Sequence, residues 1–249
     1  TMLRICLGSP NSPTTLDEAL ETETFVLWGA NIAEIYPPYM RWVTMAKQKG
    51  ARIIFLDPRE TPTRQFSDVH LRLRPGTDGA LALGAANFLI AHGLYDAGYV
   101  REKVNGFEAL KKAVAPYSLE HTAQLTGLST QEIQSFSQLL GKSHRTLIWL
   151  GGSLSRYSNS LQTVQNIIAL QAITNNLVGS GKGLMNVQGG KPGGQEEFLK
   201  YYRAPNMSHG LNIRKVLYNM KKGNVDVLLL NSSYRRYPDT KEVKARIRE

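Results

Sequence analysis

The stretch T-F-V-L-W-G-A-N at residues 24–31 carries five consecutive strand-forming residues that stop at a glycine and a polar asparagine. Later stretches of the same kind end in Asp, Gly or Asn, at residues 52–57, 146–151 and 225–231. Continuous apolar runs of this length are typical of strands that are buried on both faces, as in parallel sheets. The sequence therefore predicts a parallel strand at each of these places.

Helical periodicity separates these runs. Ser129 and Glu132 form a capping-box pattern, which marks the start of one helix. The predicted helices cover residues 37–50, 78–92, 129–140, 160–177 and 211–222. Strands that alternate with helices of this length predict an α/β fold with doubly wound, Rossmann-like parallel sheets. The stretch at about 95–140 has no strand pattern, and we expect it to form a helical insert.

The strand-to-turn pattern of residues 24–31 recurs at residues 225–231, which indicates two related halves. A boundary is expected near residues 142–145, where K-S-H-R precedes a new strand. We therefore expect residues 1–144 to form a first dinucleotide-binding α/β domain that contains the insert. Residues 145–249 are then part of a second, related α/β domain.

Composition limits the classes of function. The 30 Lys and Arg residues exceed the 20 Asp and Glu residues, which leaves a net charge of +10 and indicates an anionic partner, either nucleic acid or a polyphosphate ligand. No apolar run reaches the length of about 18 residues that a membrane span requires. Cys6 is the single cysteine, so the chain has no internal disulfide and no cysteine-ligated zinc or iron–sulfur site.

Three segments stand at or near strand ends, where ligands bind in open α/β sheets. Their candidate residues are Gly29, Asn31 and Glu34 in the first segment, Asp57, Arg59 and Thr61 in the second, and Gly76, Thr77 and Asp78 in the third. An acid such as Asp57 at a strand end commonly accepts from a ribose hydroxyl. Asp78 can pair with the N1–H and exocyclic amine of guanine. Each segment also has a purely structural explanation as a tight turn, a strand end or a helix cap.

The glycine-rich stretch at residues 179–194 predicts a long loop that approaches a flat or charged group. It is not a P-loop, because Asn176 and Gly183 stand where that motif requires a glycine and a serine or threonine. The five histidines have no metal-ligand spacing. The residues therefore identify neither a catalytic group nor a metal ligand.

Taken in order, these segments resemble one family. W-G-A-N-x-x-E at residues 28–34, D-P-R-x-T-x-T at 57–63 and L-R-P-G-T-D-x-A-L at 73–81 resemble motifs of the molybdopterin oxidoreductases of the dimethyl-sulfoxide-reductase type. G-G-S-L-S-R-Y-S-N-S at residues 151–160 is similar to the G-x-G-x-x-R-x-x-N-G segment of that family. Further likenesses lie at residues 179–190 and 228–238.

The resemblance implies an oxidoreductase in which two molybdopterin guanine dinucleotides hold one molybdenum or tungsten atom between two related α/β domains, for two-electron redox or oxygen-atom transfer. One guanosine diphosphate portion would face Gly29, Asn31, Asp57, Arg59, Gly76, Thr77 and Asp78. Gly151, Arg156 and Asn159 would lie nearer a pterin, and Asn231 near the second nucleotide. The charge of +10 fits two diphosphate ligands without nucleic acid.

The chain also departs from the family pattern. Ser153 and Ser160 replace two glycines of the G-x-G-x-x-R-x-x-N-G segment, and Gln188 stands where formate-dehydrogenase-like members often have arginine. Neither the four-cysteine segment nor the segment with the metal ligand is recognisable, and we expect the C-terminal domain of the family to be missing from this stretch of sequence. We therefore expect a central fragment that is inactive by itself, and whether it holds the cofactor is left open.

Three functions remain open at this point. The first is the cofactor-holding core of a molybdenum or tungsten enzyme, with iron–sulfur and C-terminal domains, and an electron-transfer subunit, as its partners. The second is a non-catalytic scaffold that kept the fold without the cofactor. The third is a basic nucleic-acid-binding protein, which only the aromatic and basic residues 234–237 favour. The compartment is left open between the cytoplasm and the periplasmic side of a prokaryotic cell.

Overall fold

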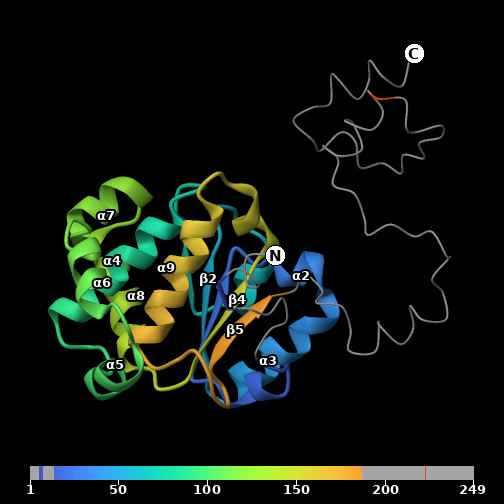
Figure 1. Ribbon diagram of the computed structural model, residues 1–249. Coiled ribbons are helices and arrows are strands. Elements are labelled where there is room, and N and C mark those ends of the chain that lie inside the picture. The colour runs from blue at the N-terminus through green and yellow to red at the C-terminus, as the bar shows by residue number, and fades with distance from the viewer. Residues whose placement is uncertain (1–5, 8–13, 187–221, 223–249) are drawn as a thin grey trace. The chain divides into compact units, whose positions relative to one another are not determined.

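The computed structural model describes residues 6–7, 14–186 and 222, and within them five parallel strands form one sheet in the order β3-β2-β1-β4-β5 (Figure 1). The strands are β1 (Thr24–Trp28), β2 (Arg52–Leu56), β3 (Val69–Leu71), β4 (Thr146–Leu150) and β5 (Gly183–Asn186). β1 lies at the centre, where it pairs with β2 on one side and β4 on the other. Its five residues are all buried, as the continuous apolar run predicted.

The prediction of strands succeeded for the long runs and failed for the short ones. β1, β2 and β4 have the predicted bounds, and the strand predicted at residues 225–230 lies outside the described residues. β3 has only three residues, too few to show a pattern. The loop predicted at residues 179–194 is wrong for β5, since Gly183–Asn186 pairs with β4 along its length. Pairing with a buried neighbour, rather than local propensity, makes this segment a strand.

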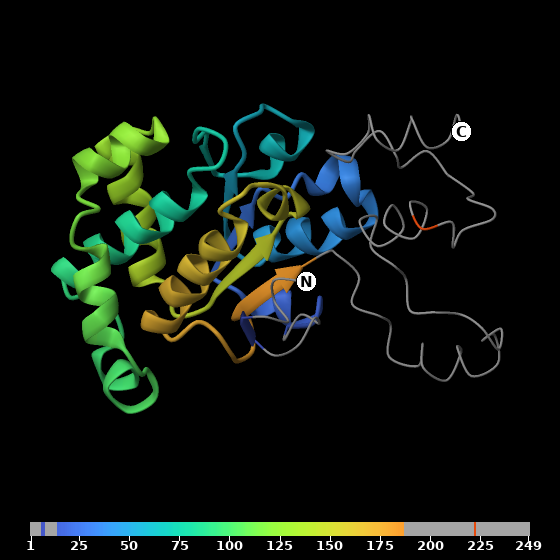
Figure 2. The ribbon, with the colours of Figure 1, turned by 45° about the horizontal axis from the view of Figure 1, so that its top comes forward.

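One face of the sheet is covered by a helical layer (Figures 1 and 2). It consists of α4 (Asp78–Ala91), α5 (Ala97–Lys103), α6 (Phe107–Val114), α7 (Leu119–Thr126), α8 (Thr130–Lys142) and α9 (Ser160–Ile173). Side chains from α4, α8 and α9 pack on one set of alternating strand residues, among them Val26, Trp28 and Ile54. The helical insert predicted at about residues 95–140 is therefore confirmed as α5 to α8.

The opposite face is covered by shorter helices from the N-terminal part of the chain. These are η1 (Glu18–Glu21), α2 (Ile32–Ile35), η2 (Pro37–Tyr39) and α3 (Met40–Gln48), while the 3₁₀ helices η3 (Pro62–Phe66) and η4 (Gly152–Arg156) follow β2 and β4. Val43 and Ala46 of α3 pack against the second set of strand residues, which includes Phe25 and Trp149. Helices on both faces make the arrangement doubly wound.

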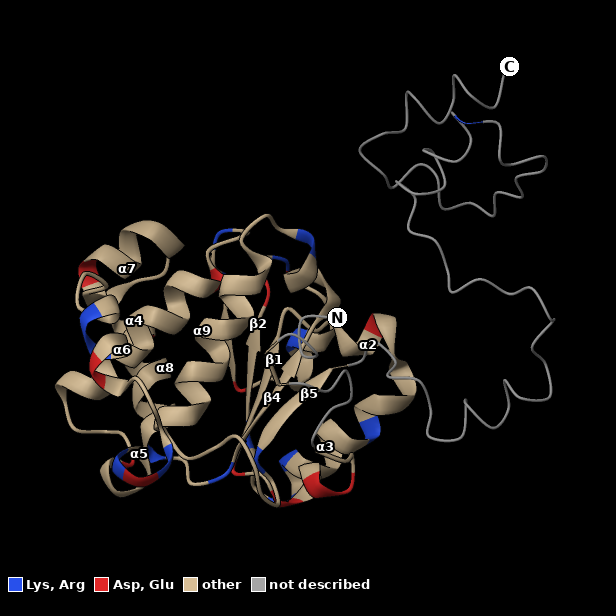
Figure 3. Cartoon of the chain, in the orientation of Figure 1, with Lys and Arg blue, Asp and Glu red and all other residues tan. Residues whose placement is uncertain are grey.

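α4 is the central helix of the larger layer and packs against α7, α8 and α9. Most of its residues are buried, including Leu81, Ala85 and Leu89, and its only charged residue is Asp78 at the first position. Figure 3 shows the same contrast: α4 and α9 are drawn almost wholly in tan, whereas most of the Lys, Arg, Asp and Glu residues lie on other elements and loops. A helix that is apolar all round needs such cover, so the carboxyl group at its start is unusual.

The helices predicted at residues 37–50, 78–92, 129–140 and 160–177 are confirmed with small differences at their ends. The helix predicted at residues 211–222 lies outside the described residues, apart from Lys222. The capping box of α8 is complete, because Ser129 and Glu132 exchange both hydrogen bonds. α9 ends at Ile173 rather than at the predicted residue 177. Asn175 has a positive φ of 54°, and the Asn176 side chain accepts a hydrogen bond from the Thr146 N–H at 2.9 Å. These contacts turn the chain back to the sheet before another helical turn can form.

The chain divides into two compact units, residues 1–192 and 193–249. β4 and β5 complete the same sheet as β1 to β3, so the predicted boundary at residues 144/145 falls inside a sheet. A second, related α/β domain remains a prediction, because residues 193–249 are described only at Lys222. Among the described residues, no helix is both long enough and apolar enough to cross a membrane.

Candidate functional site

Three strand ends lie next to one another at the carboxyl edge of the sheet. Trp28, the last residue of β1, is in register with Leu56 of β2 and Leu150 of β4. The Gly29 N–H donates to the carbonyl oxygen of Leu56 at 2.7 Å, and the Gly151 N–H donates to that of Trp28 at 2.8 Å. These main-chain bonds hold the turns after the three strands side by side, at the edge where open α/β sheets bind ligands.

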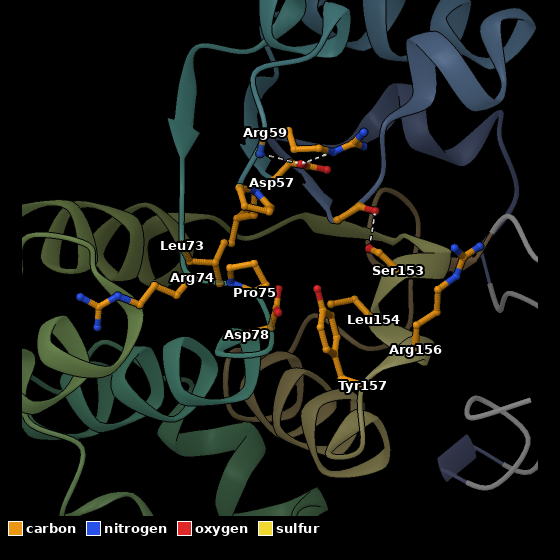
Figure 4. Close-up of a pocket in the computed structure, with 13 residues that line it drawn as sticks. Asp57, Arg59, Leu73, Arg74, Pro75, Asp78, Ser153, Leu154, Arg156 and Tyr157 are labelled. Carbon is orange, nitrogen blue, oxygen red and sulfur yellow. Dashed lines mark hydrogen bonds and ion pairs between the residues drawn. The ribbon is translucent and has the colours of Figure 1, made fainter. Parts of the chain in front are cut away.

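A cavity of about 580 Å³ opens beyond these strand ends (Figure 4). Five of the predicted site residues line it, namely Gly29, Asp57, Arg59, Asp78 and Arg156. They come from segments that follow β1, β2, β3 and β4. The structure thus brings Asp57 and Asp78 to one rim close to Gly29, as their placement at strand ends predicted. The volume lies within the range of about 300–1,000 Å³ that is usual for small-molecule sites.

Asp57 follows β2 directly, and only 5% of it is exposed. Its Oδ1 accepts a hydrogen bond from the Arg59 backbone N–H at 2.9 Å and lies 3.5 Å from Nε of the same arginine. The Arg59 side chain is largely exposed, so this ion pair is screened by solvent. The contacts fix the orientation of the carboxyl group and leave Oδ2 without a hydrogen bond among the described residues.

Asp78 is the first residue of α4 and is 8% exposed. Its Oδ1 accepts a hydrogen bond from the indole Nε1–H of Trp28 at 2.9 Å. Burial raises the pKa of Asp78 above its ordinary value, and nearby Asp57 raises it further. The hydrogen bonds from Trp28 and from its own backbone N–H oppose that rise. The cavity therefore contains a carboxyl group that is held in place but ionises less readily than usual.

Two glycines allow the turns after β1 and β4 to touch. Gly29 has a φ of +60°, and a Cβ there would lie 2.6 Å from Oγ of Ser153. A Cβ on Gly151 would overlap the carbonyl group of Gly29. Gly151 therefore serves the contact between the two turns and does not line the cavity. Ser153, which stands where the resembling family has glycine, donates its hydroxyl hydrogen to the carbonyl oxygen of Gly29 at 3.0 Å.

Asn31, Glu34 and Thr61 do not line the cavity. Asn31 is 2% exposed, its amide donates to Glu34, and its Oδ1 accepts from the Thr63 hydroxyl at 2.6 Å. The same hydroxyl oxygen accepts from the Ala33 N–H at 3.1 Å. These bonds tie the turn after β1 to η3. In this structure they give Asn31 a bracing role beside the site.

Gly76, Thr77 and Asn159 line a neighbouring cavity of about 320 Å³ between α4 and α9. The Asn159 side-chain amide donates to the carbonyl oxygen of Gly76 at 2.9 Å, and the Thr77 hydroxyl donates to that of Arg74 at 2.7 Å. These bonds join the starts of the two helices and hold the loop that leads to Asp78. Asn231 lies outside the described residues.

Several lining residues were missed from sequence alone, and Tyr157 is the most prominent. In Figure 4 its hydroxyl end and the carboxyl group of Asp78 both point into the cavity, while the guanidinium groups of Arg74 and Arg156 point outward. The other missed residues are Leu56, Pro58, Leu73, Arg74, Pro75, Ser153 and Leu154. The sequence offered only one indication of these residues: each lies within a few positions of a predicted site residue or segment. In the described part of the chain, no three His, Cys, Asp or Glu residues form a metal-binding group.

Comparison with protein families gives a match over nearly the whole chain. Residues 9–247 match the model of the family described as molybdopterin oxidoreductase. The chain is 28% identical over 184 residues to the F420-dependent formate dehydrogenase 2 subunit alpha of Methanococcus maripaludis. It is 30% identical over 209 residues to the assimilatory nitrate reductase catalytic subunit of Bacillus subtilis.

Among solved structures, acetylene hydratase from Pelobacter acetylenicus matches with a TM-score of 0.66 and 28% identity over 73% of this chain. The match covers 24% of that protein. The two sequence matches cover 74% and 81% of this chain but only 27% and 29% of the relatives. The chain thus spans less than a third of the length of each of these proteins.

Proposed function

The chain belongs to the molybdopterin oxidoreductase family, and from that premise we propose that the cavity beyond β1, β2 and β4 holds the guanosine diphosphate portion of a molybdopterin guanine dinucleotide. Family membership makes the chain part of a molybdenum or tungsten oxidoreductase. When bound, such a cofactor supplies two-electron redox chemistry at its metal, including oxygen-atom transfer. The residues of this chain would bind and orient it.

The observation that supports the proposal best is that Gly29, Asp57 and Asp78, from three separate segments, line one cavity. Their chemistry fits a guanine nucleotide. Oδ2 of Asp57 can accept from a ribose hydroxyl, and Asp78 can accept from the N1–H and amine of guanine. Gly29 has no side chain, so the ligand can approach the main chain closely. Arg59 also lines the cavity, and its positive charge favours a diphosphate. Arg156 lines the cavity too, but its guanidinium group points outward (Figure 4), and we keep it as a residue nearer the pterin.

The remaining candidate residues support the cavity or lie close to it. Asn31 and Glu34 brace the turn after β1, and Gly151 allows the turns to meet. Thr61 has a buried hydroxyl oxygen without a hydrogen bond among the described residues, which a ligand or water would satisfy. Gly76 and Thr77 form the loop that leads to Asp78, and Asn159 stabilises that loop through its hydrogen bond to Gly76. We keep Asn231 as a proposed contact of a second nucleotide.

A calorimetric titration of the 249-residue chain with GDP and ADP tests the proposal. We expect GDP to bind more tightly by about 1–3 kcal/mol, because adenine presents no donor pair to Asp78. Asp78→Ala should abolish this preference. Glu102→Ala, which removes an exposed carboxylate from α5, is the matched control and should leave it unchanged.

Equal binding of GDP and ADP, unaffected by Asp78→Ala, would remove Asp78 from the guanine role.

We further propose that the 249-residue chain does not turn over by itself, because it spans less than a third of the relatives whose names give an activity. Iron–sulfur and C-terminal domains, and an electron-transfer subunit, are the partners that we propose. A dye-reduction assay with formate and with nitrate, after supplying the cofactor, should show no reaction above that of buffer. Turnover by this chain alone would contradict the proposal.

A further inference from the structure

The indole of Trp28 lies beneath the cavity with its N–H directed at Asp78. Trp28 is fully buried, and its ring packs edge-on against Phe136 of α8 with centroids 5.8 Å apart. Its Nε1–H donates to Oδ1 of Asp78 at 2.9 Å. Because β1 is the central strand, the donor has little freedom to move, so it provides a rigid reference point for the carboxyl group.

The two carboxyl groups of the cavity differ in how they are held. Asp57 has Arg59 as an ion-pair partner, whereas the described residues contain no ion pair to Asp78. A buried carboxyl group without a cation depends on hydrogen bonds to keep its charge and its orientation. Apart from its own backbone N–H, the indole of Trp28 is the donor that meets this need.

We propose that Trp28 is a positioning residue for ligand recognition: its indole N–H holds Oδ1 of Asp78 so that Oδ2 faces the cavity. The role in recognition rests on the proposed function, whereas the link between Trp28 and Asp78 is a property of the chain itself. Trp28 itself does not line the cavity and acts only through Asp78.

Ionisation matters because only the carboxylate accepts from both donors of guanine without offering a competing proton. Burial and Asp57 raise the pKa of Asp78, and the hydrogen bond from Trp28 limits that rise. The other charged or titratable groups around the cavity are Asp57, Arg59, Arg74, Arg156 and Tyr157. The indole of Trp28 donates to none of them, so Asp78 is the group that loses a hydrogen bond when the indole donor is removed.

Trp28→Phe removes the donor and keeps an aromatic ring in the core. Trp149→Phe is a matched control, because Trp149 is 2% exposed on the neighbouring strand and its Nε1–H has no hydrogen bond among the described residues. We expect the pKa of Asp78, followed by NMR of its carboxyl carbon, to rise in Trp28→Phe and to stay unchanged in Trp149→Phe. An unchanged pKa in Trp28→Phe overturns the inference.

A measurement on the unmodified chain tests the same link even if Trp28→Phe does not fold. The indole N–H resonance of Trp28 should shift with pH at the pKa of Asp78, and this shift should disappear in Asp78→Asn, while the Trp149 resonance should not respond. A Trp28 resonance that ignores Asp78 also overturns the inference.

Titration with GDP at several pH values separates this inference from the proposed function. If the unmodified chain prefers GDP over ADP, the pH at which that preference develops should be higher in Trp28→Phe by the same amount as the pKa, and unchanged in Trp149→Phe. A preference lost equally at every pH would mean that Trp28 acts only through stability. Absence of any preference in the unmodified chain counts against the proposed function, and the NMR titrations still decide the link between Trp28 and Asp78.

Discussion

Asp78 is the residue at which stability and the proposed binding are opposed. Since its pKa is raised in the folded chain, the folded state holds the proton more tightly than the unfolded state. The free energy of unfolding therefore falls as pH rises through the folded-state pKa, and the cost persists at higher pH. A neutral side chain at this position avoids that cost.

Asp78→Asn should accordingly raise the free energy of unfolding at pH 7, because the Asn carbonyl still accepts from Trp28 and carries no buried charge. The gain should shrink as pH is lowered toward the ordinary pKa of aspartate. Urea unfolding at both ends of this range measures it. Asp57→Asn is the comparison and should give no gain, since it loses the partnership with Arg59. A loss of stability in Asp78→Asn at pH 7 would contradict this explanation.

At the scale of elements, the site depends on two turns that touch through glycines. Gly151→Ala places a Cβ on the carbonyl group of Gly29, and backbone cannot move aside as a side chain can. We expect a loss of about 3 kcal/mol or more in the free energy of unfolding. Gly98→Ala in α5 is the control: its Cβ would meet only Asp96 at 3.5 Å, so it should stabilise by about 0.5–1 kcal/mol. Thermal unfolding of both variants checks the difference.

The same elements show what sequence can predict. The strands β1, β2 and β4 were found because four or five buried residues in a row leave a continuous apolar pattern. β3 and β5 are set by the strands they pair with, which no local pattern records. The sequence also predicted which edge of the sheet carries the site, because the carboxyl ends of parallel strands lie at one edge. The sequence did not predict that Asn31 braces the turn or that Tyr157 reaches the cavity. Both depend on packing with η3 and on the turn after β4.

At the scale of the whole molecule, a net charge of +10 favours anionic ligands. Added salt screens charges over about 8 Å at physiological ionic strength. The affinity for GDP should therefore fall as salt is raised, whereas that for guanosine, which has no phosphate, should change little. Calorimetry at low and high salt compares the two ligands. Equal salt dependence would show that the diphosphate does not interact with the basic residues of the chain.

The central position of β1 also bears on how the chain folds. Its partner β2 follows after the short segments α2, η2 and α3, but its partner β4 begins only at Thr146, after all of α4 to α8. Contacts between residues so far apart in sequence form late, because the entropy of closing the loop is lost before they stabilise the chain. Until then one edge of β1, with its five core residues, has no neighbour. An unpaired strand edge of this kind can pair with another folding chain. The long segment from α4 to α8, which begins with Asp78, is therefore also the segment that delays the pairing of β1 with β4.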